Sequence, residues 1–271
     1  MEHRWEIPPQ CFALSSREDS ANRLAVGFLD GTVEVAEFDI GESTYTQQWT
    51  REQKRGIRAL LFNAEGDTLF SLGSNRGLCS YDVETKKRTR VIREAHDDKP
   101  TCAVLLPPGA TWGQMIATAD ESGKIKTWDW RVKDPVILTF DEQKEQINDM
   151  AMDWTTLLAA SSDGLLGAYE VRQRKLKTMS ELMHDELLCI VVSEKFTYVG
   201  SGDGHVEVFR RREYGNLLER MESGQKRVSS MVQMRRGLLA TASEEHHEIC
   251  LLHTEPNRRL GVAATHGEDG G

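Results

Sequence analysis

One pattern recurs six times along this chain of 271 residues and constrains its fold more than any other feature. Each copy has an apolar run, small residues, a turn rich in Asp or Gly, and an alternating segment that ends on an aromatic or aliphatic residue. The equivalent ends lie 40 to 47 residues apart, at Ala36, Tyr81, Trp128, Tyr169, Phe209 and Leu252. Repeats of this length are typical of arrays in which neighbouring units bury one another's apolar faces.

Each copy is typical of two strands joined by a tight turn. Val206 and Val208 alternate with Glu207, and alternation with a period of two indicates a strand. Asp-Gly pairs at 30–31, 163–164 and 203–204 favour hairpin turns. A further apolar strand is expected before each copy, at 11–14, 57–62, 102–106, 147–152, 188–192 and 228–231, and another after it, as at 44–49 and 88–92.

Four short strands per repeat, with no helical periodicity of useful length, predict an all-β protein. The period is that of a β-propeller blade, so we expect six recognisable four-stranded blades. The propeller domain is expected over residues 1–262 and a flexible C-terminal tail over 263–271. The repeats fall near 8–50, 51–98, 99–146, 147–186, 187–227 and 228–262.

The composition gives no support for an enzyme or a membrane protein. The longest apolar stretch, Leu187 to Val192, has six residues, and a membrane-spanning helix needs about 20. The first ten residues have no apolar segment of the kind that a secretory signal contains, so we expect none. The five cysteines form no CxxC pair, which favours reduced thiols. No GxSxG or HExxH motif is present, and no acidic pair has a base beside it. We therefore expect no catalysis, no small-molecule substrate and no cofactor.

One cluster of residues has a pattern that suggests a metal-binding site: His246, His247, Cys250 and His253. On a strand, Cys250 and His253 point to opposite faces because their offset is odd. The neighbouring Glu244 and Glu245 indicate an exposed turn instead, so we expect no metal site.

Basic residues gather in four equivalent connections, between the third and fourth strands of a repeat, although the net charge is −9. These four connections sum to +8, whereas the connections between repeats and the inner hairpin turns sum to −10. Equivalent connections of a propeller emerge on one face, so the sequence predicts one basic and one acidic face. The contact residues we expect on the basic face are Lys86, Lys87, Arg88, Arg172, Arg174, Lys175, Lys177, Arg210, Arg211 and Arg212.

Such a face suits phosphate backbones or an acidic protein segment, with an affinity that depends on salt. Tyr214 is the one aromatic residue among these clusters, so the sequence does not support base stacking. Each Arg-rich loop taken singly could also be no more than a soluble hairpin.

The repeats resemble those of the WD-repeat family. Trp128-Asp129 carries the full signature, Tyr81-Asp82 and Tyr169-Glu170 are near matches, and His96 sits where the family places a histidine between blades. Residues 147–181 and 255–268 resemble a branch of that family that serves ribosome biogenesis in the nucleolus.

The resemblance implies a non-catalytic scaffold for protein–protein interaction and rRNA processing. Its partners would be components of a pre-ribosomal particle, with contacts to rRNA phosphates as a further option. The implied location is the nucleus and nucleolus, with the cytoplasm as the alternative.

Trp128-Asp129-Trp130-Arg131 resembles the WDxR element by which some WD propellers dock on the adaptor of cullin-4 ubiquitin ligases. The alternative function is therefore a substrate receptor of such a ligase, with Trp128, Asp129 and Arg131 in the docking site. The competing interpretation is that Asp129 and Arg131 pair locally and Trp128 packs within the blade.

The number of blades is the remaining structural question. The family branch has a further repeat after the equivalent of His266-Gly267-Glu268, and this sequence stops at Gly271. We favour a seven-blade design without its last repeat over a ring of six blades. In such a design, Trp5–Ile7 would supply the outer strand of the last blade. The identity of the partner, the functional face and the oligomeric state stay open.

Overall fold

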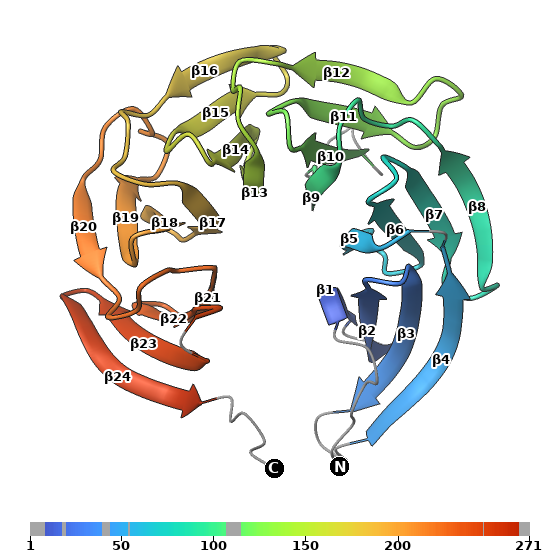
Figure 1. Ribbon diagram of the computed structural model, residues 1–271, viewed down its shortest axis with the longest axis horizontal. Helices are drawn as coiled ribbons and strands as arrows, with labels where there is room; N and C mark the ends of the chain where they lie inside the picture. The colour runs from blue at the N-terminus through green and yellow to red at the C-terminus, as the bar shows by residue number, and fades with distance from the viewer. Residues whose placement is uncertain are drawn as a thin grey trace. The chain divides into compact units, whose positions relative to one another are not determined.

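The computed structural model describes residues 9–17, 20–39, 44–53, 55–106, 115–245 and 247–265. In these residues the chain forms twenty-four strands and no helix. Successive groups of four strands make six antiparallel sheets, and each sheet takes its strands from one continuous stretch (Figure 1). The prediction of an all-β propeller with six four-stranded blades is confirmed.

The chain divides into two compact units, each of which holds three of these sheets. The first unit covers residues 1–121 and 125–139. Its strands are β1 (Pro9–Arg17), β2 (Ser20–Phe28), β3 (Thr32–Asp39), β4 (Thr44–Glu52), β5 (Ile57–Phe62), β6 (Thr68–Gly73), β7 (Leu78–Asp82), β8 (Lys87–Ile92), β9 (Pro100–Leu105), β10 (Met115–Asp120), β11 (Ile125–Asp129) and β12 (Val136–Phe140).

The second unit covers residues 122–124 and 140–271. Its strands are β13 (Ile147–Asp153), β14 (Thr156–Ser161), β15 (Leu166–Glu170), β16 (Lys175–Met179), β17 (Leu187–Val192), β18 (Phe196–Ser201), β19 (His205–Arg210), β20 (Glu219–Glu222), β21 (Ser230–Arg235), β22 (Leu238–Ala242), β23 (Glu248–Thr254) and β24 (Asn257–Thr265).

Several boundaries differ from the sequence prediction; the first strand, for example, covers Pro9–Arg17 instead of 11–14. The first strand of the sixth sheet begins at Ser230 rather than Val228, because Val228 N donates to Ser201 O of the neighbouring sheet (3.1 Å). Residues 263–265, expected in a flexible tail, are the end of β24 and pair with β23. Trp5–Ile7 and His266-Gly267-Glu268 lie outside the described residues, and the seventh repeat stays a prediction.

The core lies between the sheets, and the burial of the strands follows from this. All six residues of β10 and all six of β14 are buried, because these second strands have neighbouring strands on both edges. β8 is a fourth strand with a free edge, and its residues are exposed or half-buried. The six equivalent repeat ends identified in the sequence are at most 2% exposed, which confirms them as core positions.

His96 connects the second and third sheets of the first unit through a buried chain of hydrogen bonds. Its Nδ1 lies 2.8 Å from Asp120 Oδ2 and its Nε2 lies 2.7 Å from Thr118 Oγ1. Trp128 Nε1 donates to the same Thr118 hydroxyl (2.7 Å). Buried polar groups are stable only when they are paired, and here each ring nitrogen has a partner. The predicted position of His96 between blades is confirmed.

Gln143 has the corresponding place in the fourth sheet, in the second unit. Tyr169 Oη donates to Gln143 Oε1 (3.0 Å), and Gln143 Nε2 donates to Leu165 O (3.2 Å). The ring of Phe140 lies 4.8 Å from that of Tyr169. In both repeats, a polar residue in the connection between two sheets forms hydrogen bonds with the sheet that follows. This residue is a histidine in one repeat and a glutamine in the other.

Candidate binding surface

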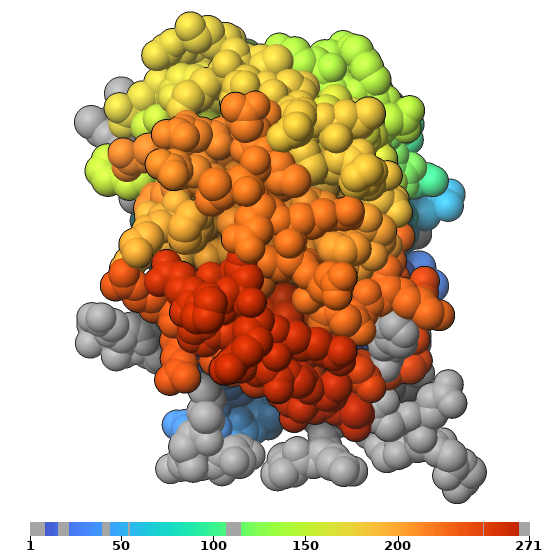
Figure 2. All heavy atoms as spheres, turned by 90° about the vertical axis from the view of Figure 1, so that its left-hand side faces the viewer, coloured from blue at the N-terminus to red at the C-terminus, as the bar shows by residue number. Residues whose placement is uncertain are grey.

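The connections of the second unit separate into two ends of its three sheets. We call one of them the arginine end; it comprises residues 154–155, 171–174, 193–195, 211–218, 236–237 and 255–256. Contacts between sheets bring these connections together. Arg211 reaches Asp153 of the fourth sheet, Lys195 reaches Glu255 of the sixth, and Arg236 reaches Glu194 of the fifth. Figure 1 shows the three sheets side by side, and in Figure 2 the orange fifth sheet lies between the yellow fourth and the red sixth.

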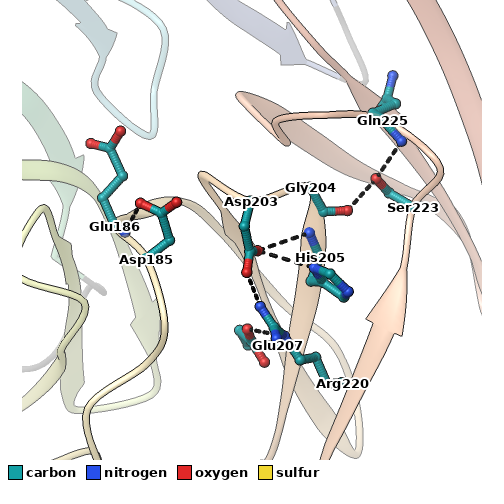
Figure 3. A network of polar contacts seen from close by, with 9 residues as sticks. All are labelled: Asp185, Glu186, Asp203, Gly204, His205, Glu207, Arg220, Ser223 and Gln225. Carbon is teal, nitrogen blue, oxygen red and sulfur yellow. Dashed lines mark hydrogen bonds and ion pairs between the residues drawn. The ribbon is translucent and has the colours of Figure 1, made fainter.

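Figure 3 shows part of the opposite end, which we call the hairpin end and which comprises residues 141–146, 162–165, 180–186, 202–204, 223–229, 243–245 and 247. Asp203 accepts from His205 N (3.3 Å) and lies 3.1 Å from its Nδ1. Arg220 contacts both Asp203 and Glu207, and Arg227 pairs with Glu186 (2.6 Å). Several of the acidic side chains counted from the sequence at this end are therefore held by neighbouring cations.

The arginine end carries carboxylates that the sequence count left out. The count considered the third-to-fourth connections and overlooked the first-to-second connections, which emerge at the same end. These bring Glu194 beside Arg236 (3.7 Å) and Asp153 beside Arg211 (2.6 Å). The surface is therefore a mixture of cations and carboxylates, in which the free cations are fewer than the sequence count implies.

Arg211 and Tyr214 are both tied to the buried carboxylate of Asp153. Arg211 Nε donates to Asp153 Oδ1 (2.6 Å), and Tyr214 Oη donates to Asp153 Oδ2. The side chain of Asp153 is 1% exposed and Tyr214 is fully buried. These contacts fasten the connection after β19 to the end of β13. Tyr214, the aromatic residue that the sequence placed among the basic clusters, therefore has no surface for a ligand.

The other predicted contact residues of the second unit lie at or near the arginine end. Arg172, Arg174, Lys175, Lys177, Arg210 and Arg212 are exposed. Lys86, Lys87 and Arg88 are also exposed and belong to the first unit, where Lys86 ends the corresponding turn and Lys87 and Arg88 begin β8. There, Lys86 Nζ donates to Gln48 O (3.2 Å) and Arg51 donates to Lys86 O (2.8 Å). The binding role of all these residues stays a prediction.

Three of these basic residues share an unusual backbone conformation. Lys86, Arg174 and Arg212 have φ values of 61°, 58° and 70°, and each lies in the connection between the third and fourth strands of its sheet. The left-handed region is the usual place of glycine, because a Cβ there approaches the following carbonyl oxygen. Three sheets thus carry a cation at a turn position where glycine would be free of strain.

The WDxR segment is held by contacts within the chain. Arg131 Nε and Nη2 donate to the two oxygens of Asp129, at 2.9 and 2.6 Å, and this pair lowers the pKa of Asp129. Trp128 is 1% exposed and packs in the core between the second and third sheets, so it offers no surface to an adaptor. The side chain of Arg131 is 45% exposed to solvent. Docking through Arg131 and Asp129 stays a prediction.

The histidine and cysteine residues near the last sheet lie apart. Cys250 is fully buried, His247 is exposed, and His253 Nδ1 lies 3.1 Å from Pro256 O. Among the residues that the structure describes, no group of three His, Cys, Asp or Glu could hold a metal ion. His246 lies outside the described residues. The same part of the chain contains no helix long and apolar enough to cross a membrane.

The sheets of four strands and the buried Trp-Thr-His-Asp chain define the class of protein as a β-propeller whose repeats resemble WD repeats. No family model matches the chain. It is similar to WD repeat-containing protein 55 of Bos taurus, with 27% identity over 251 residues. The protein of that name in Homo sapiens is 27% identical over 248 residues, and the homolog in Aedes aegypti is 30% identical over 251 residues.

These alignments cover 90 to 91% of this chain. They cover 64%, 63% and 51% of the three relatives, so the chain spans less than two thirds of their length. The resemblance to WD-repeat proteins that the sequence motifs indicated is confirmed by the relatives and by the fold.

Proposed function

We propose that this chain is a non-catalytic WD-repeat scaffold that binds anionic surfaces of partner macromolecules through the connections between its third and fourth strands. The observation that carries the proposal is the left-handed conformation of Lys86, Arg174 and Arg212. A non-glycine residue in that region costs about 1–2 kcal/mol, so a packing requirement alone would favour glycine. A cation that contacts a partner gives a reason for the cost.

Ribosome biogenesis is the setting that we propose. The support is the similarity to proteins named WD repeat-containing protein 55, together with the nucleolar role that the sequence resemblance implies. In this setting the partners are proteins, or rRNA phosphates, of a pre-ribosomal particle. A nuclear and nucleolar location is part of the same proposal.

Charge reversal at one turn tests this proposal. Arg172, Arg174 and Lys175 lie in the fourth sheet, are exposed, and can be replaced together by Glu. We expect the triple variant to lose co-sedimentation with pre-ribosomal particles, because repulsion replaces the attraction between the turn and its anionic partner. Its unfolding midpoint in urea should stay close to that of the unmodified chain.

Lys144→Glu is the control, because Lys144 is exposed and lies in the connection before the fourth sheet, away from the arginine end. This variant should co-sediment normally. Retention of the triple variant on the particles would refute the proposed binding role.

A further inference from the structure

A depression at the arginine end of the fifth sheet combines cations with an aromatic wall. It has a volume of about 540 Å³ and is lined by Glu194, Lys195, Phe196, Arg210, Arg211 and Arg212. One side consists of residues 194–195 from the connection between β17 and β18, with Phe196 at the start of β18, and the other consists of Arg210 at the end of β19 with residues 211–212 that follow it. The backbone joins the two sides, since Arg211 N donates to Lys195 O (3.0 Å).

The three arginines of the depression have different roles. Arg211 is held by Asp153 and by a hydrogen bond to Glu194 O (3.3 Å), so its guanidinium stabilises the depression from within the protein. Arg212 has no side-chain partner among the residues that the structure describes, and its left-handed turn position leaves it exposed. The side chain of Arg210 is 62% exposed, and within the described part of the chain its ion-pair partner is Glu213, at 3.9 Å. Arg210 and Arg212 are therefore the guanidinium groups available to a ligand.

The ion pairs at the rim are weak enough to be exchanged. Arg210 and Glu213 are 3.9 Å apart, and Lys195 and Glu255 are 3.5 Å apart. All four side chains are at least 43% exposed, and pairs of this kind contribute little to stability. A carboxylate of a ligand can replace Glu213 on Arg210 with better, two-point geometry.

Phe196 supplies an apolar wall that the sequence did not reveal. It is half-buried, packs against the core between the fifth and sixth sheets, and its ring lies 6.3 Å from that of Tyr198. In the sequence, Phe196 lies fourteen residues before Arg210, and only the fold brings the two into one depression. An apolar side chain of a ligand can contact the exposed part of this ring.

The distribution of charge favours a peptide over a nucleic acid. Glu194, Glu213 and Glu255 stand among the cations of this region, where a backbone with one phosphate per nucleotide would approach them. A peptide can place carboxylates on two arginines and keep neutral residues beside the glutamates. The combination of two exposed guanidinium groups with one aromatic ring matches such a segment.

We propose that the depression binds a short acidic peptide segment of a partner protein. Carboxylates of the segment pair with Arg210 and Arg212, and an apolar side chain lies against Phe196. This inference rests on the proposed scaffold function and names the class of partner for one of its surfaces.

Fluorescence anisotropy with the full chain tests the proposal. The probe is a fluorescein-labelled peptide in which one phenylalanine is flanked on both sides by glutamates. Arg210→Ala and Arg212→Ala should each weaken its binding about ten-fold, because each removes a charge-assisted pair. Lys144→Ala, a cation removed away from the arginine end, should leave the affinity unchanged. Added salt should lower the affinity, and glutamine in place of glutamate in the probe should abolish binding.

Two results would overturn the inference. One is equal binding of the probe by the unmodified chain and by the double variant of Arg210 and Arg212. The other is binding of single-stranded poly-uridine RNA that depends on Arg210 and Arg212 and is tighter than that of the peptide. Loss of particle binding in the Arg172, Arg174 and Lys175 variant, together with either result, would refute the peptide site and leave the scaffold function intact.

Discussion

Arg211 differs from its two neighbours because its guanidinium lies against the buried carboxylate of Asp153, 2.6 Å away. The side chain of Arg211 is 24% exposed, whereas Arg210 and Arg212 are exposed. The sequence shows a run of three arginines and predicts the same contact role for each. Asp153 is 58 residues away in the chain, so only the packing of the fifth sheet on the fourth shows which arginine is used internally.

Replacement of Arg211 should destabilise the fold, because it leaves the carboxylate of Asp153 buried with Tyr214 as its remaining donor. We expect Arg211→Ala to lower the free energy of unfolding by about 2–4 kcal/mol. Arg212→Ala should change it by less than about 0.5 kcal/mol, since its side chain is exposed. Urea denaturation measures both values. An equal effect of the two substitutions would contradict this assignment.

Asp149 is a half-buried acid with a marked effect on the pH dependence of stability. It lies in β13, and its Oδ2 accepts from Ile190 N of β17 (2.8 Å) while its Oδ1 accepts from Met150 N (2.8 Å). Burial raises its pKa from 3.8 to about 6, against the effect of these two hydrogen bonds. Cys189 faces the same space, and burial raises the pKa of its thiol to about 12, so it stays neutral.

The raised pKa makes the folded state bind a proton that the unfolded chain has lost between pH 3.8 and about 6. The stability that Asp149 contributes is therefore complete below pH 3.8 and is lost as the pH rises through about 6. The loss in the free energy of unfolding is at most about 3 kcal/mol. Asp149→Asn should remove this dependence. Urea denaturation of the unmodified chain and of the Asp149→Asn variant between pH 3.8 and about 6 measures this dependence. Parallel pH profiles of the two proteins would show that Asp149 does not titrate as described.

At the scale of strands and turns, the sequence predicts most of the structure. The Asp-Gly pairs were expected in hairpin turns, and Gly31, Gly164 and Gly204 have φ values of 97°, 78° and 84°, as such turns require. The predicted strands at 57–62 and 147–152 agree with β5 and β13 to within one residue. Alternating side chains and glycine turns are local features, which is why they can be read from the chain alone.

The turns with Lys86, Arg174 and Arg212 show where local signals fail. No glycine marks the left-handed position in these turns, so the sequence gives no sign of the backbone conformation. The composition of the arginine end also depends on tertiary packing, because the connections after β13 and β17 bring Asp153 and Glu194 to it. Phe196 joins the depression for the same reason. Candidate residues could thus be named from the sequence, but not the division between structural and accessible cations.

At the scale of the whole molecule, a net charge of −9 conceals exposed cations at the arginine end of the second unit. Asp203 of the hairpin end and Glu207 of β19 are both paired with Arg220, as Figure 3 shows, and Glu186 is paired with Arg227. Association with an anionic partner is therefore compatible with an acidic protein, because binding depends on the local rather than the net charge.

The double variant Arg174→Gly, Arg212→Gly separates binding from folding most directly. Glycine relieves the left-handed strain at both turns, and the greater freedom of the unfolded chain offsets part of the gain. We predict an unfolding free energy equal to that of the unmodified chain or up to about 1 kcal/mol higher, together with loss of co-sedimentation with pre-ribosomal particles. Undiminished co-sedimentation of this folded variant would contradict the account.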